Sequence, residues 1–257
     1  GGERLIGLSD ESGEFEWVTL PANGIGPERV LTEDGSVLRY EGVPSPNGAR
    51  VAYVDHRRDL WVLDVESGEQ KRINQQSEGT ADQVWSADSR WLAFVETAPN
   101  TFRQIKLYDT QGGGIVDVTS DRVNSQSPSW GPDGDFLYFL SDRNLSSTVQ
   151  SPWGARQPEP HFADPWEIYH VSLRKGIRSP FAPDDELAER AERDSADDSE
   201  DRDVEIAIAI DLDGIQRRAK KLPVPAGSYS ALSAGEAALF YVSREDGATA
   251  LMAVPIT

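Results

Sequence analysis

Three stretches of the chain share one pattern of hydrophobic and polar positions. Each begins with small residues at the end of a strand. A turn follows, in which Pro or Ala precedes an Asx residue and Gly or Ser comes after it. The stretch then continues into a run of aromatic and branched apolar residues. The stretches are residues 44–54, 84–95 and 129–140. Asx followed by Gly favours a hairpin, because both residues tolerate positive φ. The pattern therefore predicts three β-hairpins.

A third alternating run follows each hairpin, at residues 59–64, 104–109 and 166–171. Alternation of apolar and polar residues indicates a strand with one buried face. In the last run His170 alternates with apolar neighbours, which predicts that it lies on the polar face. Turns at residues 66–69 and 111–114 then lead to short fourth strands near residues 72–73 and 115–118. Four successive strands per unit are typical of a β-propeller blade.

The repeat period supports this fold class. The turn residues Asn47, Asp88 and Asp133 are 41 and 45 residues apart, within the period of roughly 40–50 residues expected for propeller blades. An immunoglobulin-like sandwich has turns but no repeated unit of this length. Weaker copies occupy residues 14–31 and 229–254, and residues 204–211 and 219–224 supply two strands of another blade. We predict an all-β propeller of about five to six four-stranded blades, with an incomplete ring.

Two insertions interrupt the expected single domain of residues 1–257. Residues 141–165 form a Pro-rich loop, and proline at this density prevents a regular strand or helix. This loop is either a binding element or a packed cap. Residues 183–203 form an acidic insertion that we expect to be disordered. It is interpreted as a solvated linker, since its acids lack the spacing of a calcium loop, the sharper alternative.

The charge of the chain limits its partners. The net charge is −19, and residues 184–203 contribute −8 of it through eleven acids and three arginines. Nucleic acid needs a basic stripe, which this chain lacks. A window of 18 uninterrupted apolar residues is also missing, which argues against a membrane partner. The acidity and the scarcity of lysine fit a halophilic source, and GC-rich coding explains them equally well.

Candidate chemistry is sparse. The chain has no Cys, so disulfides and thiolate sites are excluded. His56, His161 and His170 form no metal-ligand pair, and we expect no metal and no cofactor. The chain has no G-x-S-x-G motif, and Gly112-Gly113-Gly114 lacks the Lys-Ser/Thr of a phosphate loop. No pair of acids stands out as a glycosidase site.

Several blocks resemble a known family. The hairpins are similar to those of TolB-type and tricorn-protease-type propellers. The more specific blocks resemble tricorn-like serine peptidases, and they cover residues 141–144, 151–158, 172–183, 210–215 and 222–229. The position of the acidic insertion between these blocks fits the same family. The resemblance extends over nearly the whole chain.

The resemblance implies a function. In this family two successive propellers precede a PDZ-like domain and a serine-peptidase core. This chain resembles the second propeller, which has seven blades and is thought to gate peptides on their way to the active site. We therefore expect a non-catalytic domain that guides peptides to a core outside this chain, and a parent protein that is a serine peptidase. Within this interpretation Arg143 and Arg156 are candidates for contacting a peptide carboxylate, because Arg makes bidentate contacts with such groups. Salt bridges that pack the loop are the alternative role.

Other interpretations stay open. A TolB-like scaffold that binds a protein partner through the Pro-rich loop is the second candidate function, and a stand-alone propeller enzyme has little support. The expected partners are peptide or protein ligands and other domains of a longer chain, and open propeller edges allow an oligomer. The sequence fits a periplasmic or a cytoplasmic prokaryotic protein equally.

Overall fold

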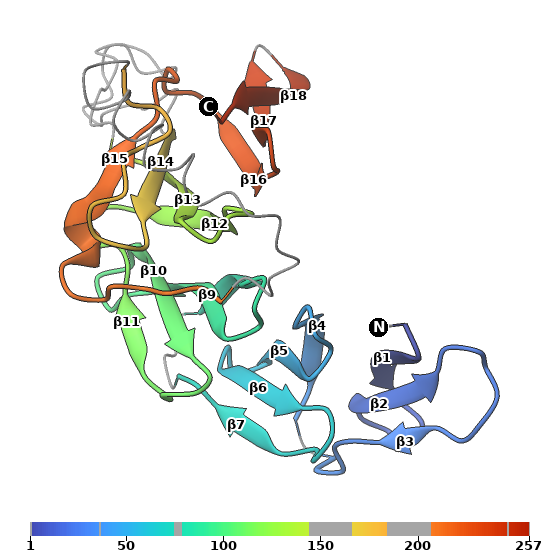
Figure 1. The fold of residues 1–257 in the computed structure, drawn as a ribbon. Helices are drawn as coiled ribbons and strands as arrows, with labels where there is room; N and C mark the ends of the chain where they lie inside the picture. The colour runs from blue at the N-terminus through green and yellow to red at the C-terminus, as the bar shows by residue number, and fades with distance from the viewer. Residues whose placement is uncertain are drawn as a thin grey trace, which may run out of the picture. The chain divides into compact units, whose positions relative to one another are not determined.

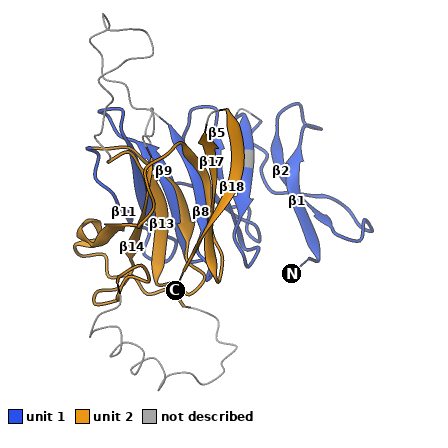
Figure 2. Cartoon of the chain, turned by 90° about the horizontal axis from the view of Figure 1, so that it is seen from above, with its two compact units in different colours: residues 1–122 blue, residues 123–257 orange. Residues whose placement is uncertain are grey.

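A computed structural model describes residues 2–35, 37–74, 79–143, 166–183, 207–245 and 247–256. Its regular structure is almost entirely β-strand, and the short 3-10 helix η1 (Ile215–Arg218) is the only helical element of the described part (Figure 1). The chain divides into two compact units, residues 1–122 and 123–257 (Figure 2). The prediction of a single domain over residues 1–257 stays a prediction.

The first unit contains three antiparallel sheets, each ordered as the strands follow in the chain. The first sheet has three strands, β1 (Arg4–Ser9), β2 (Glu16–Pro21) and β3 (Arg29–Val30). The second has four, β4 (Arg39–Pro44), β5 (Arg50–Asp55), β6 (Leu60–Asp64) and β7 (Gln70–Arg72). The third also has four, β8 (Thr80–Trp85), β9 (Trp91–Thr97), β10 (Arg103–Asp109) and β11 (Ile115–Asp117).

The second unit contains two sheets of the same kind. The fourth sheet is formed by β12 (Ser125–Trp130), β13 (Phe136–Ser141), β14 (Glu167–Ser172) and β15 (Ala219–Lys221). The fifth has three strands, β16 (Tyr229–Ala234), β17 (Ala238–Glu245) and β18 (Ala248–Pro255). The four-stranded meanders confirm the predicted propeller blades.

The predicted turns form as the sequence indicates. Gly48, Ser89 and Gly134 have φ of 70°, 59° and 73°, and each follows the Asx residue of its turn. In each turn the amide of this residue donates to the carbonyl three residues earlier, over 2.8, 2.9 and 3.0 Å. Residues in the left-handed region thus close all three hairpins.

A repeated backbone contact shows that the first four sheets are copies of one unit. The amides of Leu31, Ile73, Val118 and Leu222 donate to the carbonyls of Trp17, Leu60, Ile105 and Ile168, respectively. This contact joins the end of the fourth strand to the third strand of each blade. By this alignment β1, β2 and β3 correspond to the second, third and fourth strands of a blade.

One expected pairing is wrong. Residues 219–224 were predicted to belong to a separate blade, whereas β15 pairs with β14 as the fourth strand of the fourth sheet, with Val171 opposite Ala219. Residues 207–210 form no strand, and residues 204–206 lie outside the described part. Some 46 residues therefore separate the third and fourth strands of this blade. Sequence spacing alone gave no sign of a pairing across so long an insertion.

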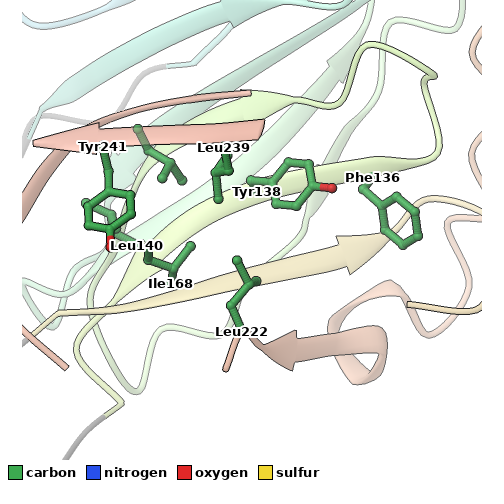
Figure 3. Packing of buried hydrophobic residues seen from close by; sticks show 8 residues of the cluster. Phe136, Tyr138, Leu140, Ile168, Leu222, Leu239 and Tyr241 are labelled. Carbon is green, nitrogen blue, oxygen red and sulfur yellow. The ribbon is translucent and has the colours of Figure 1, made fainter. Parts of the chain in front are cut away.

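The core of the second unit lies between the fourth and fifth sheets. Figure 3 shows Phe136, Tyr138 and Leu140 of β13 near Ile168 of β14 and Leu239 of β17. Leu140, Ile168 and Leu239 are fully buried. Burial raises the pKa of Tyr138. Across the two sheets, the amide of Ala234 also donates to Ser129 Oγ over 2.9 Å.

Buried polar contacts join neighbouring sheets of the first unit. Arg39 of β4 donates to Glu16 of β2 over 3.0 Å, and both side chains are almost completely buried. Asn74 accepts from the amide of Leu60 over 2.8 Å and donates to Glu96 of β9 over 2.7 Å. The Arg39–Glu16 and Asn74–Glu96 contacts each tie a side chain of one blade to the next, so adjacent blades are fixed by polar as well as apolar packing.

Candidate functional site

The candidate site is centred on Arg143, which follows the end of β13. Its guanidinium carbon lies 5.0 Å from the ring centroid of Tyr169 and 5.9 Å from that of Phe139. The two rings stack with centroids 5.8 Å apart and planes at 20°, because Phe139 and Tyr169 are cross-strand partners of β13 and β14. Both rings thus contact the same cation, an arrangement that cation–π attraction stabilises.

The residues before Arg143 are held in place by Asn124, at the start of the fourth sheet. The amide of Asn124 donates to Asp142 Oδ1 over 2.7 Å, and its side-chain amide donates to Asp142 Oδ2 over 2.6 Å. Ser141 Oγ donates to the carbonyl of Asn124 over 2.9 Å. These bonds fix the backbone at the end of β13 and thereby the position from which Arg143 extends.

The nearby carboxylates already have partners. Asp142 is bound by Asn124, and Glu167 accepts from the hydroxyl of Tyr169 over 2.9 Å and forms an ion pair with Lys221. Burial and the hydrogen bond to Glu167 raise the pKa of Tyr169 to about 12, against the opposing charge of Arg143. Tyr169 therefore stays neutral at physiological pH.

Arg143 itself has no ion pair with any carboxylate of the described residues. Its Nε is buried and finds no hydrogen-bond partner in the same part of the chain. The side chain is half-buried. Within the described residues, in a chain with 44 acids, this guanidinium is therefore held by aromatic rings and not by a carboxylate.

The second predicted residue cannot be compared with Arg143. Arg156 lies outside the described residues, as do most of the Pro-rich loop and of the acidic insertion. The sequence prediction also missed the aromatic pair, although Phe139 and Tyr169 lie in strands that it identified. The missing information was the strand register, which the gap between β13 and β14 conceals.

His170 is not on a polar face, so that prediction is wrong. Its side chain is 1 % exposed, its Nε2 lies 2.7 Å from Ser179 Oγ, and its ring meets Phe136 edge-on with centroids 5.1 Å apart. Residues 179–181 cover this side of β14, since Phe181 also lies against the His170 ring, 6.0 Å between centroids. Burial, with a smaller contribution from Lys220, lowers the pKa of His170 to about 4.

The described residues offer neither a metal site nor a membrane-spanning helix. They contain no group of three or more His, Cys, Asp or Glu side chains placed to hold a metal ion. No helix in this part of the chain is long and apolar enough to cross a membrane.

Successive four-stranded antiparallel meanders define the chain as a β-propeller domain. Its residues 1–252 match the family described as the tricorn protease second beta propeller domain. The chain belongs to this family, which confirms the resemblance inferred from the sequence.

Individual relatives agree with this assignment. Tricorn protease homolog 1 of Streptomyces coelicolor is 28 % identical over 242 residues, which are 92 % of this chain and 22 % of that protein. The tricorn protease of Thermoplasma volcanium is 30 % identical over 112 residues, 41 % of this chain and 11 % of that protein. The chain therefore spans less than a quarter of the length of these curated relatives.

Solved structures share the fold. The crystal structure of the tricorn protease is similar with a TM-score of 0.76 at 19 % identity, over 95 % of this chain and 22 % of that one. TolB from Acinetobacter baumannii is similar with a TM-score of 0.55 at 14 % identity, over 100 % of this chain and 51 % of TolB. At these identities the likeness concerns the fold alone.

Proposed function

We propose that this propeller domain binds peptides through a carboxylate and holds them for a serine-peptidase core in another part of its parent protein. Membership of the tricorn second-propeller family supports the link to peptides. The cleavage chemistry is assigned to residues outside this chain. The observation that carries the proposal is Arg143, a guanidinium without a carboxylate partner in the described residues.

The geometry around Arg143 suits a peptide carboxylate. A guanidinium can bind a carboxylate through two parallel hydrogen bonds. Stacking on Tyr169 and Phe139 limits the rotamers of Arg143 before a ligand arrives, so less side-chain entropy is lost on binding. The rings also offer apolar area to the last side chain of the peptide. Arg156, the second candidate from the sequence, stays part of the proposal as a further contributor from the Pro-rich loop.

The test measures peptide affinity in matched variants. Fluorescence anisotropy follows a labelled peptide with a free C-terminal carboxylate, and the same peptide with an amidated C-terminus. Arg143→Met keeps the apolar stem and removes the charge, and we expect about tenfold weaker binding of the free-carboxylate peptide. Arg244→Met is the control, because Arg244 is an exposed residue of β17 in the same unit.

Two results would contradict the proposal. The first is undiminished affinity of Arg143→Met for the free-carboxylate peptide. The second is equal binding of the amidated peptide to the wild-type chain. Arg156→Met, assayed in the same way, decides whether the loop arginine shares the role.

The second candidate function is a scaffold that captures a protein partner, as the shared fold with TolB allows. In that case the Pro-rich loop is the contact surface, and deletion of residues 145–163 abolishes capture. Unchanged capture after the deletion removes the loop from this function.

A further inference from the structure

A cavity of about 370 Å³ lies between the second and third sheets of the first unit. One wall is a face of the second sheet, where Arg50 is opposite Asp64 and Val62 is opposite Lys71. The other wall is formed by Tyr108 and Thr110, at the end of β10. The cavity therefore has an apolar floor and an aromatic wall, and its lining carries two cations, Arg50 and Lys71, and two acids, Asp64 and Glu69.

Lys71 lines this cavity and has no carboxylate partner among the described residues. Its Nζ lies 5.5 Å from the ring centroid of Tyr108. A Cβ added at Gly113, where φ is 71°, would lie 3.3 Å from that Nζ. The glycine-rich turn 112–114 has no lysine of a phosphate loop in its own sequence. In the folded chain it lies close to Lys71, a lysine of the neighbouring blade.

Most of the other lysines differ from Lys71 in having a carboxylate partner. Lys106, Lys175 and Lys221 each form an ion pair with a carboxylate. Among the described residues Lys71 forms none, although the whole chain has 44 acids and only 25 basic residues. Lys220 also lacks an ion pair in this part of the chain, and it lies outside the cavity, so it serves as a control.

Two carboxylates near the cavity, those of Asp64 and Asp109, already have hydrogen-bond partners. Asp64 Oδ1 accepts from the amide and the hydroxyl of Ser67, both over 2.9 Å. These bonds and the charge of Arg50 lower the pKa of Asp64. Asp109, at the end of β10, is held by two hydrogen bonds from Arg90, of 3.1 and 3.0 Å. Glu69 is exposed at the rim. None of these three acids forms an ion pair with Lys71, which is therefore available to a ligand.

The backbone amides of this turn already donate hydrogen bonds within the hairpin, so they are not available to an anion. The amide of Gly113 donates to the carbonyl of Asp109 over 2.7 Å, and that of Asp109 donates to the carbonyl of Gly114 over 3.0 Å. The turn is therefore a closed hairpin and not a phosphate-binding nest. An anion in this cavity would therefore be bound by side-chain cations and not by backbone amides.

We propose that this cavity binds a small organic carboxylate, held between Lys71 and Arg50 with its apolar body on Val62 and Tyr108. A charge-assisted bond to Lys71 supplies the affinity, and the aromatic wall excludes water from one side of it. The lining residues all belong to the first unit, whereas Arg143 belongs to the second, and binding here does not depend on the presence of a peptidase core.

The test is a titration of the ¹⁵N-labelled chain, followed by NMR. The probe is N-acetylalanine, and N-acetylalaninamide is the matched neutral compound. We expect saturable shifts of the amides of Thr110 and of residues 112–114 with the acid and none with the amide. Lys71→Met should weaken binding about tenfold, and Lys220→Met should leave it unchanged.

The variants remain interpretable because Lys71 is exposed, so Lys71→Met should unfold at the same temperature as the wild-type chain. Absence of saturable shifts in the wild-type chain overturns the proposal. Equal binding of the amide, or equal loss in Lys71→Met and Lys220→Met, overturns it too. The proposal is also overturned if Lys71→Met binds N-acetylalanine with the affinity of the wild-type chain.

Discussion

The buried pair of Glu16 and Arg39 offers a quantitative test of how the first two sheets are joined. The Glu16 and Arg39 side chains are 4 % and 0 % exposed. Glu16 accepts from Arg39 over 3.0 Å, from the amide of Gly35 over 2.7 Å, and from the hydroxyl of Thr32. Glu16→Met removes the acceptor for all three donors and leaves a buried cation without this partner.

Breaking a buried ion pair on one side costs about 3–5 kcal/mol. Arg39 keeps some acceptors, since it also donates to the carbonyl of Phe15 over 2.9 Å and to the carboxylate of Asp34. We therefore expect the lower end, a loss of about 3 kcal/mol in the free energy of unfolding. The double variant Glu16→Met with Arg39→Met should be more stable than Glu16→Met, because it also removes the buried guanidinium that Glu16→Met leaves without its buried carboxylate partner.

The assay is urea unfolding followed by circular dichroism. Because two compact units can unfold separately, amide hydrogen exchange in β2 and β4 assigns the loss to the first unit. The control is Arg72→Met, since Arg72 is 39 % exposed in its 3.4 Å pair with Asp59, and it should cost less than about 1 kcal/mol. A loss for Glu16→Met no larger than that of Arg72→Met would refute the reasoning, and so would a double variant less stable than the single one.

Three further predictions concern stability. His170 has its folded-state pKa lowered to about 4 from an unfolded value near 6.5, so its contribution to stability is present above pH 6.5 and is lost as the pH falls towards 4, by about 3 kcal/mol. Urea midpoints across this range should therefore fall less in His170→Phe than in the wild-type chain, and an equal fall would contradict the assignment. Gly48→Ala should cost about 1 kcal/mol for its φ of 70° in open space. Gly68→Ala should cost more, because its Cβ would lie 2.8 Å from the carbonyl oxygen of Leu31, and equal thermal shifts for the two would argue against that contact. Leu140→Ala should cost about 2–5 kcal/mol because Leu140 is fully buried, and a loss below 1 kcal/mol in calorimetry would contradict the packing of the second unit.

The hairpins were predictable because their signals are local. Asn47-Gly48 and Asp133-Gly134 combine turn chemistry with apolar runs on both sides, and each residue's neighbours in sequence are its neighbours in the sheet. Local preference and final structure therefore agree. The family also followed from the sequence, because its specific blocks extend over most of the chain.

The third strand beyond the Pro-rich loop was predicted at residues 166–171, whereas its register and the pairing across the acidic insertion were not predictable. β15 joins β14 after the acidic insertion, and only the register of the folded sheet decides this. The same applies to the site, since Arg143 was selected for its charge, whereas its stacking on Tyr169 depends on a partner strand beyond the Pro-rich loop. Burial of His170 likewise depends on residues 179–181 folding over β14, which periodicity within one strand does not show.

The central claim is that this chain binds peptides and leaves their cleavage to another part of the parent protein. The most direct measurement is mass spectrometry of a free-carboxylate peptide incubated with the purified wild-type chain at a concentration that saturates binding. We predict that the peptide is bound and stays intact, and that a fluorophosphonate reagent labels no serine of the chain. Cleavage of the peptide that this reagent inhibits would contradict the account.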